Sequence, residues 1–235
     1  MAKEPRPAPV FLIAGGRDTK AGCYSALLAR IFRSSGKDRP RIAYIGAATA
    51  DDAGFIKYMR ALLESGGPCD WELAPLAGRK GSHDKARRVV EASDLVFVGG
   101  GDVERGMHWL VEREMIACLT QKHAGGAPFF GVSAGAIMLC KKWVRWKDPD
   151  DDSTAEPFDC LGLADTLCDT HCEDDGWEEL KALLALEDER AVGWGIRCGA
   201  ALAVGPGGSV EVVAGTADEL SLHGEKARPV RAAPS

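Results

Sequence analysis

Long apolar runs and net positive charge are both missing from this sequence of 235 residues. A membrane helix needs about 18 consecutive apolar residues, and the early apolar run at residues 10–14 is too short even for a signal peptide. The 35 Asp and Glu residues outnumber the 29 Lys and Arg residues, which gives a formal net charge of −6. A dedicated nucleic-acid binder would need a basic surface. We therefore expect a cytoplasmic protein that has neither a membrane nor a nucleic acid as its partner.

The cysteine content is also too low for a disulfide scaffold, with eight residues in the whole chain. A disulfide scaffold carries roughly 8–10% cysteine, so we expect reduced and mostly buried thiols. Hydrophobic residues make up 46% of the chain and charged residues 27%. This composition is typical of a globular domain that is large enough to be stabilised by its own core.

Two phosphate-binding motifs are absent as well. The run Gly99, Gly100, Gly101 and Asp102 lacks the last glycine of G-x-G-x-x-G, and G-x-x-x-x-G-K-[ST] does not occur. The sequence therefore excludes a P-loop and a dinucleotide fingerprint, and we expect no cofactor.

Short apolar runs alternate with segments of helical periodicity between residues 9 and 142. The apolar runs predict strands within 9–16, 41–48, 71–77, 94–101 and 127–135, and the periodic segments predict helices over 22–34, 52–65, 83–92, 103–122 and 134–142. This alternation indicates an α/β fold whose mostly parallel sheet has helices on both faces. Residues 143–157 are expected to form a polar, acidic connection, before a helix over 176–187 and antiparallel edge strands within 191–205 and 209–215.

We expect a single domain over residues 10–222. Residues 1–9, which contain three prolines, are expected to form a disordered leader, and residues 223–235 a flexible tail.

The strand predicted at 127–135 ends in the clearest chemical motif of the sequence. Residues 131–135, Gly-Val-Ser-Ala-Gly, fit the G-x-S-x-G elbow, in which a sharp turn exposes the hydroxyl of a serine above the sheet. The following helix would also point its positive end at a developing oxyanion. The alternative is a strand-to-helix turn of small residues without chemistry, but the strand–turn–helix context favours Ser133 as a nucleophile.

A nucleophilic serine needs a base, and His171 is the best candidate. It lies downstream of Ser133, directly before a predicted helix. The other four histidines fall in predicted helices or in the tail: His83, His108, His123 and His223.

The residues around His171 also offer metal ligands. Cys168, His171 and Cys172, with Asp169 and Glu173 nearby, are suitable types. A zinc site normally combines such a motif with a second ligand pair, which this sequence lacks. We therefore expect no metal.

Four motifs occur in a familiar order: VGGGD at 98–102, GVSAGA at 131–136, FDCLGLADTLCDTHC at 158–172 and GWGIRCGAALAV at 193–204. Together they resemble the aspartyl dipeptidase (peptidase E) and cyanophycinase family of serine peptidases over most of residues 10–215. The resemblance implies a three-layer α/β/α sandwich related to class I glutamine amidotransferase domains, with Ser in place of Cys. It also implies a substrate that is a small peptide or an isopeptide-like amide.

The resemblance assigns the catalytic roles. Ser133 would be the nucleophile and His171 the general base, and the backbone N–H groups of Ala134 and of Gly100 or Gly101 would form the oxyanion hole.

The acidic third member of the triad would come from the loop after the nucleophile helix. That loop holds four aspartates: Asp148, Asp150, Asp151 and Asp152. Asp148 lies 15 residues after Ser133, a spacing similar to that of the dipeptidase branch, and Asp151 would suit the cyanophycinase branch. We expect Asp148, and the remaining aspartates would belong to a solvated acidic loop.

The sequence departs from the family in two places. Family members usually have arginines after the catalytic His, but this sequence has Glu173, Asp174 and Asp175 there. In the later strand the family usually carries G-I-x-E, but this sequence has Arg197 and then Cys198. A compensating swap would make Arg197 the cation for an acidic substrate. A change in substrate recognition is equally open, and drift of two surface segments ranks below both. We expect Asp102 and Arg197 to contact the substrate.

Two other functions fit the same residues. One is a binding or regulatory relative that keeps the fold but lacks catalysis, and the other is an amidase or esterase on the same scaffold. The sequence leaves the oligomeric state open, with a homodimer among the options.

Overall fold

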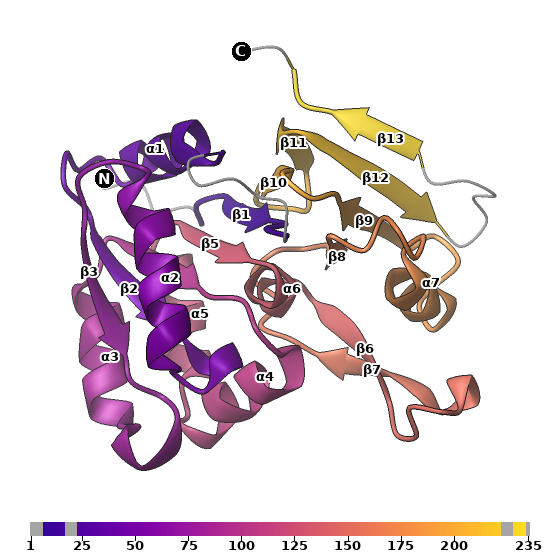
Figure 1. The fold of residues 1–235 in the computed structure, drawn as a ribbon, viewed down its shortest axis with the longest axis horizontal. Coiled ribbons are helices and arrows are strands. Elements are labelled where there is room, and N and C mark those ends of the chain that lie inside the picture. The colour runs from indigo at the N-terminus through magenta and orange to yellow at the C-terminus, as the bar shows by residue number, and fades with distance from the viewer. Residues whose placement is uncertain (1–6, 17–22, 222–227, 234–235) are drawn as a thin grey trace, which may run out of the picture.

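A seven-stranded sheet forms the centre of the computed structural model, which describes residues 7–16, 23–221 and 228–233 (Figure 1). Its strand order is β11-β10-β1-β5-β4-β2-β3. The five strands β1, β5, β4, β2 and β3 run parallel, and β10 and β11 add an antiparallel edge beside β1. The bounds are β1 (Val10–Ile13), β2 (Arg41–Ile45), β3 (Asp70–Ala74), β4 (Leu95–Val98), β5 (Phe129–Val132), β10 (Ala201–Val204) and β11 (Val210–Ala214).

Helices cover both faces of this sheet because its inner strands are apolar on both sides. In β1, Val10 and Leu12 belong to one core cluster, whereas Phe11 and Ile13 belong to another on the opposite face. The first face carries α3 (His83–Ala92), α4 (Val103–Glu112), α5 (Ile116–Ala124) and α6 (Ala134–Leu139). The second face carries α1 (Ser25–Ser34) and α2 (Ala53–Glu64).

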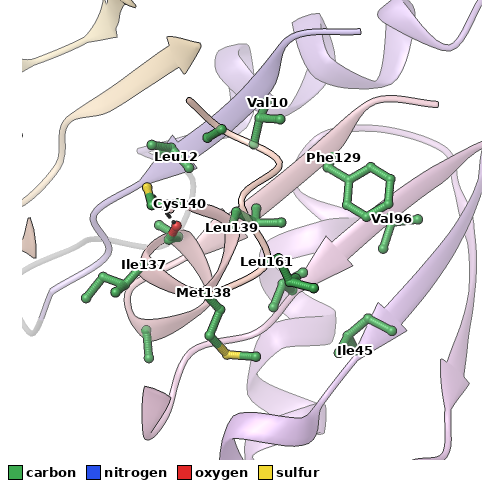
Figure 2. Close-up of a cluster of buried hydrophobic side chains, with 14 of the residues drawn as sticks. Val10, Leu12, Ile45, Val96, Phe129, Ile137, Met138, Leu139, Cys140 and Leu161 are labelled. Atoms are coloured by element: carbon green, nitrogen blue, oxygen red, sulfur yellow. Dashed lines mark hydrogen bonds between the residues drawn. The ribbon is translucent and has the colours of Figure 1, made fainter. Parts of the chain in front are cut away.

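The short helix α6 is embedded in the first core. All six of its residues are buried. Figure 2 shows Leu139 and Cys140 near Val10 and Leu12 of β1, whereas Ile137 and Met138 point to the other side of the helix. This packing fixes the helix that follows the G-x-S-x-G turn.

A second sheet of four strands has the order β13-β12-β9-β8. Its strands are β8 (Leu167–Thr170), β9 (Val192–Ile196), β12 (Thr216–Ser221) and β13 (Arg228–Arg231). The helix α7 (Glu178–Ala185) packs against it through a small core that contains Trp177, Leu180 and Leu183. A two-stranded hairpin of β6 (Lys142–Trp146) and β7 (Ala155–Asp159) lies beside α7 (Figure 1). Short 3-10 helices occupy Ala47–Thr49, Gly78–Lys80 and Asp152–Thr154.

The predicted α/β class, with a mostly parallel sheet, is confirmed. So is the antiparallel edge near the C-terminus, which β10 and β11 form. The segment expected within 191–205 as an edge strand is in fact two strands, β9 and β10, and only β10 joins the large sheet. The second sheet was not predicted, because apolar periodicity does not show which strands pair with one another.

The helix expected over 103–122 is in fact two helices, α4 and α5, separated by a break at Glu114. This residue has a φ of 52°, in the left-handed region that ends a regular helix. The helical spacing nevertheless continues across the break, since Leu110, Glu114 and Cys118 follow one another at intervals of four residues. Periodicity therefore predicted one helix where the chain turns.

The segment 143–157 is a hairpin and not an irregular connection, and the helix expected over 134–142 ends at Leu139. Arg145 and Lys147 on one arm form salt bridges with Glu156 on the other. The charges that suggested a polar connection therefore pair across the two strands, and the tip holds the aspartates.

The expected leader and tail are only partly described. Residues 1–6 and 222–227, with His223, lie outside the described residues. Within the expected leader, the Ala8 carbonyl oxygen bonds the ring of His123. Residues 228–231 form β13 and pair with β12, which corrects the prediction of a flexible tail for that stretch. No helix in the described ranges has the length and apolar character needed to span a membrane.

Candidate active site

Ser133 lies in the turn between β5 and α6, with a backbone conformation that is rare for a residue with a side chain. Its φ is 53° and its ψ is −127°, which costs on the order of 1–3 kcal/mol. The turn is held on both sides: the Ser133 N–H donates to the Ile13 carbonyl oxygen at 2.9 Å, and its own carbonyl oxygen accepts from Ala136 at 2.8 Å. The hydroxyl is thereby left free of the turn's backbone bonding, as in a nucleophile elbow.

The two glycines of the motif are explained by close backbone approaches. A Cβ on Gly131 would lie 2.4 Å from the Gly135 carbonyl oxygen. A Cβ on Gly135 would lie 2.1 Å from the carbonyl oxygen of Val98 in β4. Any larger residue would push α6 away from the sheet and displace Ser133.

The structure brings Ser133 and His171 together, with 2.8 Å between Ser133 Oγ and His171 Nε2. His171 directly follows β8 and also has a positive φ, of 49°. The backbone N–H of His171 donates to the carbonyl oxygen of Ile196 in β9 at 2.9 Å. The large sheet therefore positions the hydroxyl, and the second sheet positions the imidazole.

The chain after β1 passes close to both residues. A Cβ on Gly15 would lie 3.9 Å from Ser133 Cβ, and one on Gly16 would lie 3.5 Å from His171 Cβ and only 2.4 Å from Cys198 Sγ. The Gly15 N–H donates to the Tyr24 hydroxyl at 3.0 Å. These contacts place the end of β1 along one side of the Ser133–His171 pair.

The residues predicted for the oxyanion hole lie around Ser133. A Cβ on Gly100 would be 3.2 Å from Ser133 Cβ, Gly101 follows it with a φ of 138°, and Ala134 opens α6. No acceptor within the described part of the chain bonds the N–H groups of these three residues.

Asp148 is exposed in the turn between β6 and β7, where it stabilises its own loop. Its carboxylate accepts the N–H of Asp150 at 3.1 Å, and its N–H donates to the Thr154 hydroxyl at 3.0 Å. Asp151 accepts from Ser153, which lowers the pKa of the Asp151 carboxyl. Within the described ranges, no hydrogen bond connects the four loop aspartates with His171.

The two residues expected to contact substrate have partners inside the fold. The Asp102 carboxylate caps α4 by accepting the Arg105 N–H at 2.7 Å. The Arg197 guanidinium binds Asp218 of β12 through two bonds of 2.8 and 2.7 Å, and these bonds raise the pKa of Arg197 above its ordinary value. The Asp218 side chain is only 2% exposed and also accepts from Trp177 Nε1. Arg197 therefore neutralises a buried carboxylate.

Glu173 is a residue that the sequence interpretation missed. Its Oε1 accepts the N–H of Cys198 at 2.9 Å, while its Oε2 is buried without a hydrogen-bond partner. The sequence signal was the position of an acid two residues after His171, but Glu173, Asp174 and Asp175 looked like one acidic run. In the fold these acids have different partners, since Glu173 accepts the N–H of Cys198 whereas Asp175 accepts the N–H of Trp177.

Similarity to known proteins extends over most of the chain. A family model described as Peptidase family S51 matches residues 10–212. Peptidase E of Pasteurella multocida (strain Pm70) is 26% identical over 129 residues, which are 54% of this chain and 51% of that protein. Peptidase E of Streptomyces coelicolor (strain ATCC BAA-471 / A3(2) / M145) is 29% identical over 133 residues, which are 56% of this chain and 51% of that protein. The chain spans about half the length of the curated relatives it matches.

Two solved structures have a similar fold. The crystal structure of a peptidase from an acI-B1 Actinobacterium has a TM-score of 0.73 at 15% identity, covering 99% of this chain and 97% of that one. A putative peptidase E protein from Listeria monocytogenes EGD-e has a TM-score of 0.62 at 17% identity, covering 88% of this chain and 98% of that one.

We predict that Gly135→Ala disrupts the turn. The new methyl group would overlap the Val98 carbonyl oxygen, so the free energy of unfolding should fall by about 1–3 kcal/mol or more. Urea denaturation measures this loss. Gly125→Ala is the matched control, because its φ is −71° and a Cβ there would come no closer than 3.4 Å to another atom. Equal stability of the two variants would refute the packing explanation for Gly135.

Proposed function

Since the chain belongs to peptidase family S51, we propose that it is a serine peptidase that hydrolyses small peptides through Ser133 and His171. The observation that carries this proposal is the distance of 2.8 Å between Ser133 Oγ and His171 Nε2. A hydroxyl at hydrogen-bond distance from an imidazole, on a strained elbow, is the arrangement of an activated nucleophile.

The proposed reaction has two halves. Ser133 Oγ attacks the scissile carbonyl carbon while His171 Nε2 takes the hydroxyl proton, and the resulting imidazolium gives that proton to the leaving amine as the C–N bond breaks. Water then attacks the acyl-enzyme, with His171 again taking a proton and returning it to Ser133. The second half releases the acid and restores the free enzyme.

The negative oxygen of each tetrahedral intermediate would be held by backbone donors. Ala134 N–H and the N–H of Gly100 or Gly101 are supported by their position around Ser133 and by the lack of a bound acceptor in the described part of the chain. Removing one donor of this kind typically costs about 10²–10³ in rate.

Two carboxylates compete for the role of orienting His171. Asp148 is favoured by its spacing from Ser133, but its carboxylate bonds within its own loop. Glu173 is favoured by its buried Oε2, which lacks a partner and lies two residues from the base. A buried carboxylate oxygen normally finds a donor, and the imidazolium formed during attack would supply one. We therefore place Glu173 ahead of Asp148.

For the substrate, the charges favour peptides without an acidic residue at the scissile bond. Arg197 already neutralises Asp218, whereas Glu173, Asp174 and Asp175 lie two to four residues after His171. A carboxylate brought to this surface would meet like charges, which is costly. This supports a change in recognition over a compensating swap.

We predict that Ser133→Ala reduces peptide hydrolysis by at least about 10³-fold, because the nucleophile is lost while the backbone turn remains. A fluorophosphonate probe should label the wild-type chain at Ser133 and leave the variant unlabelled. Ser65→Ala, at the end of α2, is the control and should keep full activity. A folded wild-type chain that never labels would support a non-catalytic relative, and labelling combined with turnover of esters or simple amides but not peptides would support the other hydrolase classes.

We predict that Glu173→Gln lowers kcat/KM by at least about 100-fold, because an amide cannot stabilise the imidazolium as a carboxylate does. Asp148→Asn should change it less than about threefold. Asp174→Asn serves as the control for a general loss of negative charge near the site. A larger loss of kcat/KM in Asp148→Asn than in Glu173→Gln would assign the orienting role to Asp148. Near-normal kcat/KM in both variants would indicate a Ser–His dyad without an acidic member.

We predict that Ala-Xaa and Lys-Xaa dipeptides are hydrolysed with a kcat/KM at least about tenfold higher than Asp-Xaa dipeptides, because like charges near the site oppose the acidic substrate. Arg197→Ala should affect all three substrates equally, through loss of the pair with Asp218. A selective loss of Asp-Xaa turnover in that variant would instead place Arg197 in substrate recognition.

A further inference from the structure

Three potential metal ligands from separate elements meet beside the turn that carries His171. They are Asp169 at the end of β8, Cys172 in the turn and Glu179 in the first turn of α7, which we call the Asp169 cluster. One oxygen or sulfur atom from each lies within 4.8 Å of the others. None of these side chains has a part in the reaction proposed above.

The Asp169 carboxylate is buried without a positively charged partner. The residue is only 1% exposed. Its Oδ1 accepts the N–H of Thr170 at 2.6 Å, but its buried Oδ2 has no partner in hydrogen-bond geometry. The Cys172 thiol beside the carboxylate is a weak, neutral donor, and its interaction lowers the pKa of Asp169 against the rise caused by burial. A buried carboxylate oxygen without a partner is costly, unless a proton or a cation neutralises it.

The surroundings of the cluster supply no such cation. In the part of the chain that the structure describes, no salt bridge from Lys or Arg reaches Asp169 or Glu179. Burial raises the pKa values of Asp169, Cys172 and Glu179, and the charged neighbours that raise them further are other carboxylates, including Asp175 and Glu178. The cluster is therefore an acidic group with one thiol and no basic partner among the described residues, in which Asp169 is buried and Cys172 and Glu179 are half-buried.

We propose that the Asp169 cluster binds a divalent zinc-class metal ion, with one oxygen of Asp169, the Cys172 sulfur and one oxygen of Glu179 as ligands. A thiolate selects zinc-class ions over Mg²⁺ and Ca²⁺, which prefer oxygen ligands alone. Three protein ligands leave one position of a tetrahedral site for water. Binding releases the Cys172 thiol proton, and any proton on the two carboxyl groups, to solvent.

The fold, and not the sequence motif, selects these ligands. The sequence groups Cys168 with His171 and Cys172, but Cys168 is fully buried in the main core, with its Sγ 3.3 Å from Cys140 Sγ. His171 Nε2 meets Ser133 instead. Glu179 is the third ligand because α7 begins at Glu178, soon after the turn, which places Glu179 eight residues after His171. A bound ion would cross-link β8, the turn and α7.

The test is a titration of the purified, untagged full chain with Zn²⁺ after removal of adventitious metal by a chelator. We expect one Zn²⁺ ion per chain by calorimetry and elemental analysis. With Co²⁺ as the probe, we expect the absorption band of a cobalt–thiolate bond. Cys172→Ser and Glu179→Gln should each weaken Zn²⁺ binding by at least about 100-fold, and Cys172→Ser should also abolish the band, because a lost ligand costs more than a lost outer contact.

Two variants control for general effects of thiols and charge. Cys118→Ser in α5 and Glu178→Gln, the neighbour of Glu179 in α7, should bind Zn²⁺ like the wild-type chain. Circular dichroism checks that every variant is folded. Absence of stoichiometric binding to the wild-type chain would overturn the proposal and indicate that Asp169 is neutralised by a proton. Equal binding by all variants would also overturn it, since the ion would then lie elsewhere. The readout is metal binding, so either failure leaves the proposed peptidase activity untouched.

Discussion

The hydrogen bond from the Ser133 N–H to the Ile13 carbonyl oxygen fixes the part of the molecule on which the site depends. It joins the end of β1 to the residue after β5, so the turn begins at a defined height above the sheet. Gly131 and Gly135 then allow α6 to return close to β4 and β5. Because β5 before it and α6 after it are both held in place, Ser133 keeps a backbone conformation that it would not hold in a free peptide.

The base reaches this serine through a different set of strands. His171 is positioned by the pairing of β8 with β9, and β9 in turn pairs with β12. Trp177 and Arg197 both bind Asp218 of β12, and the Trp177 ring packs against Gly195, where a Cβ would lie 2.4 Å away. The second sheet, its helix and this buried carboxylate form the frame that supports the imidazole. A substitution in β12 can therefore alter the site without contacting it.

The sequence predicts the large sheet and the Ser133 turn because these depend on local patterns, whereas His171 was identified by comparison with the other four histidines and by the family resemblance. The buried strands are short apolar runs, and G-x-S-x-G marks one tight turn whose glycines have a steric cause. The break at Glu114 and the β6–β7 hairpin were missed because periodicity continues through a turn and because Glu156 pairs with residues of the facing strand. Glu173 and Glu179 could not be singled out, since what distinguishes them is a buried oxygen and a tertiary neighbour. The role expected for Arg197 rests on its charge and on its place in the segment where the family carries G-I-x-E, and the sequence does not reveal that Asp218 lies beside it.

The position of β1 between β5 and β10 has a consequence for how the chain is made. Residues 10–13 of β1 pair with residues 129–132 on one side and with residues 201–204 on the other. At a synthesis rate of roughly 5–20 residues per second, about 190 residues separate β1 from its second neighbour, a delay of about 10–40 s. Throughout that interval one edge of β1 offers unpaired backbone groups to any other extended chain. The nascent protein is therefore exposed to aggregation along the strand whose end later lies beside Ser133.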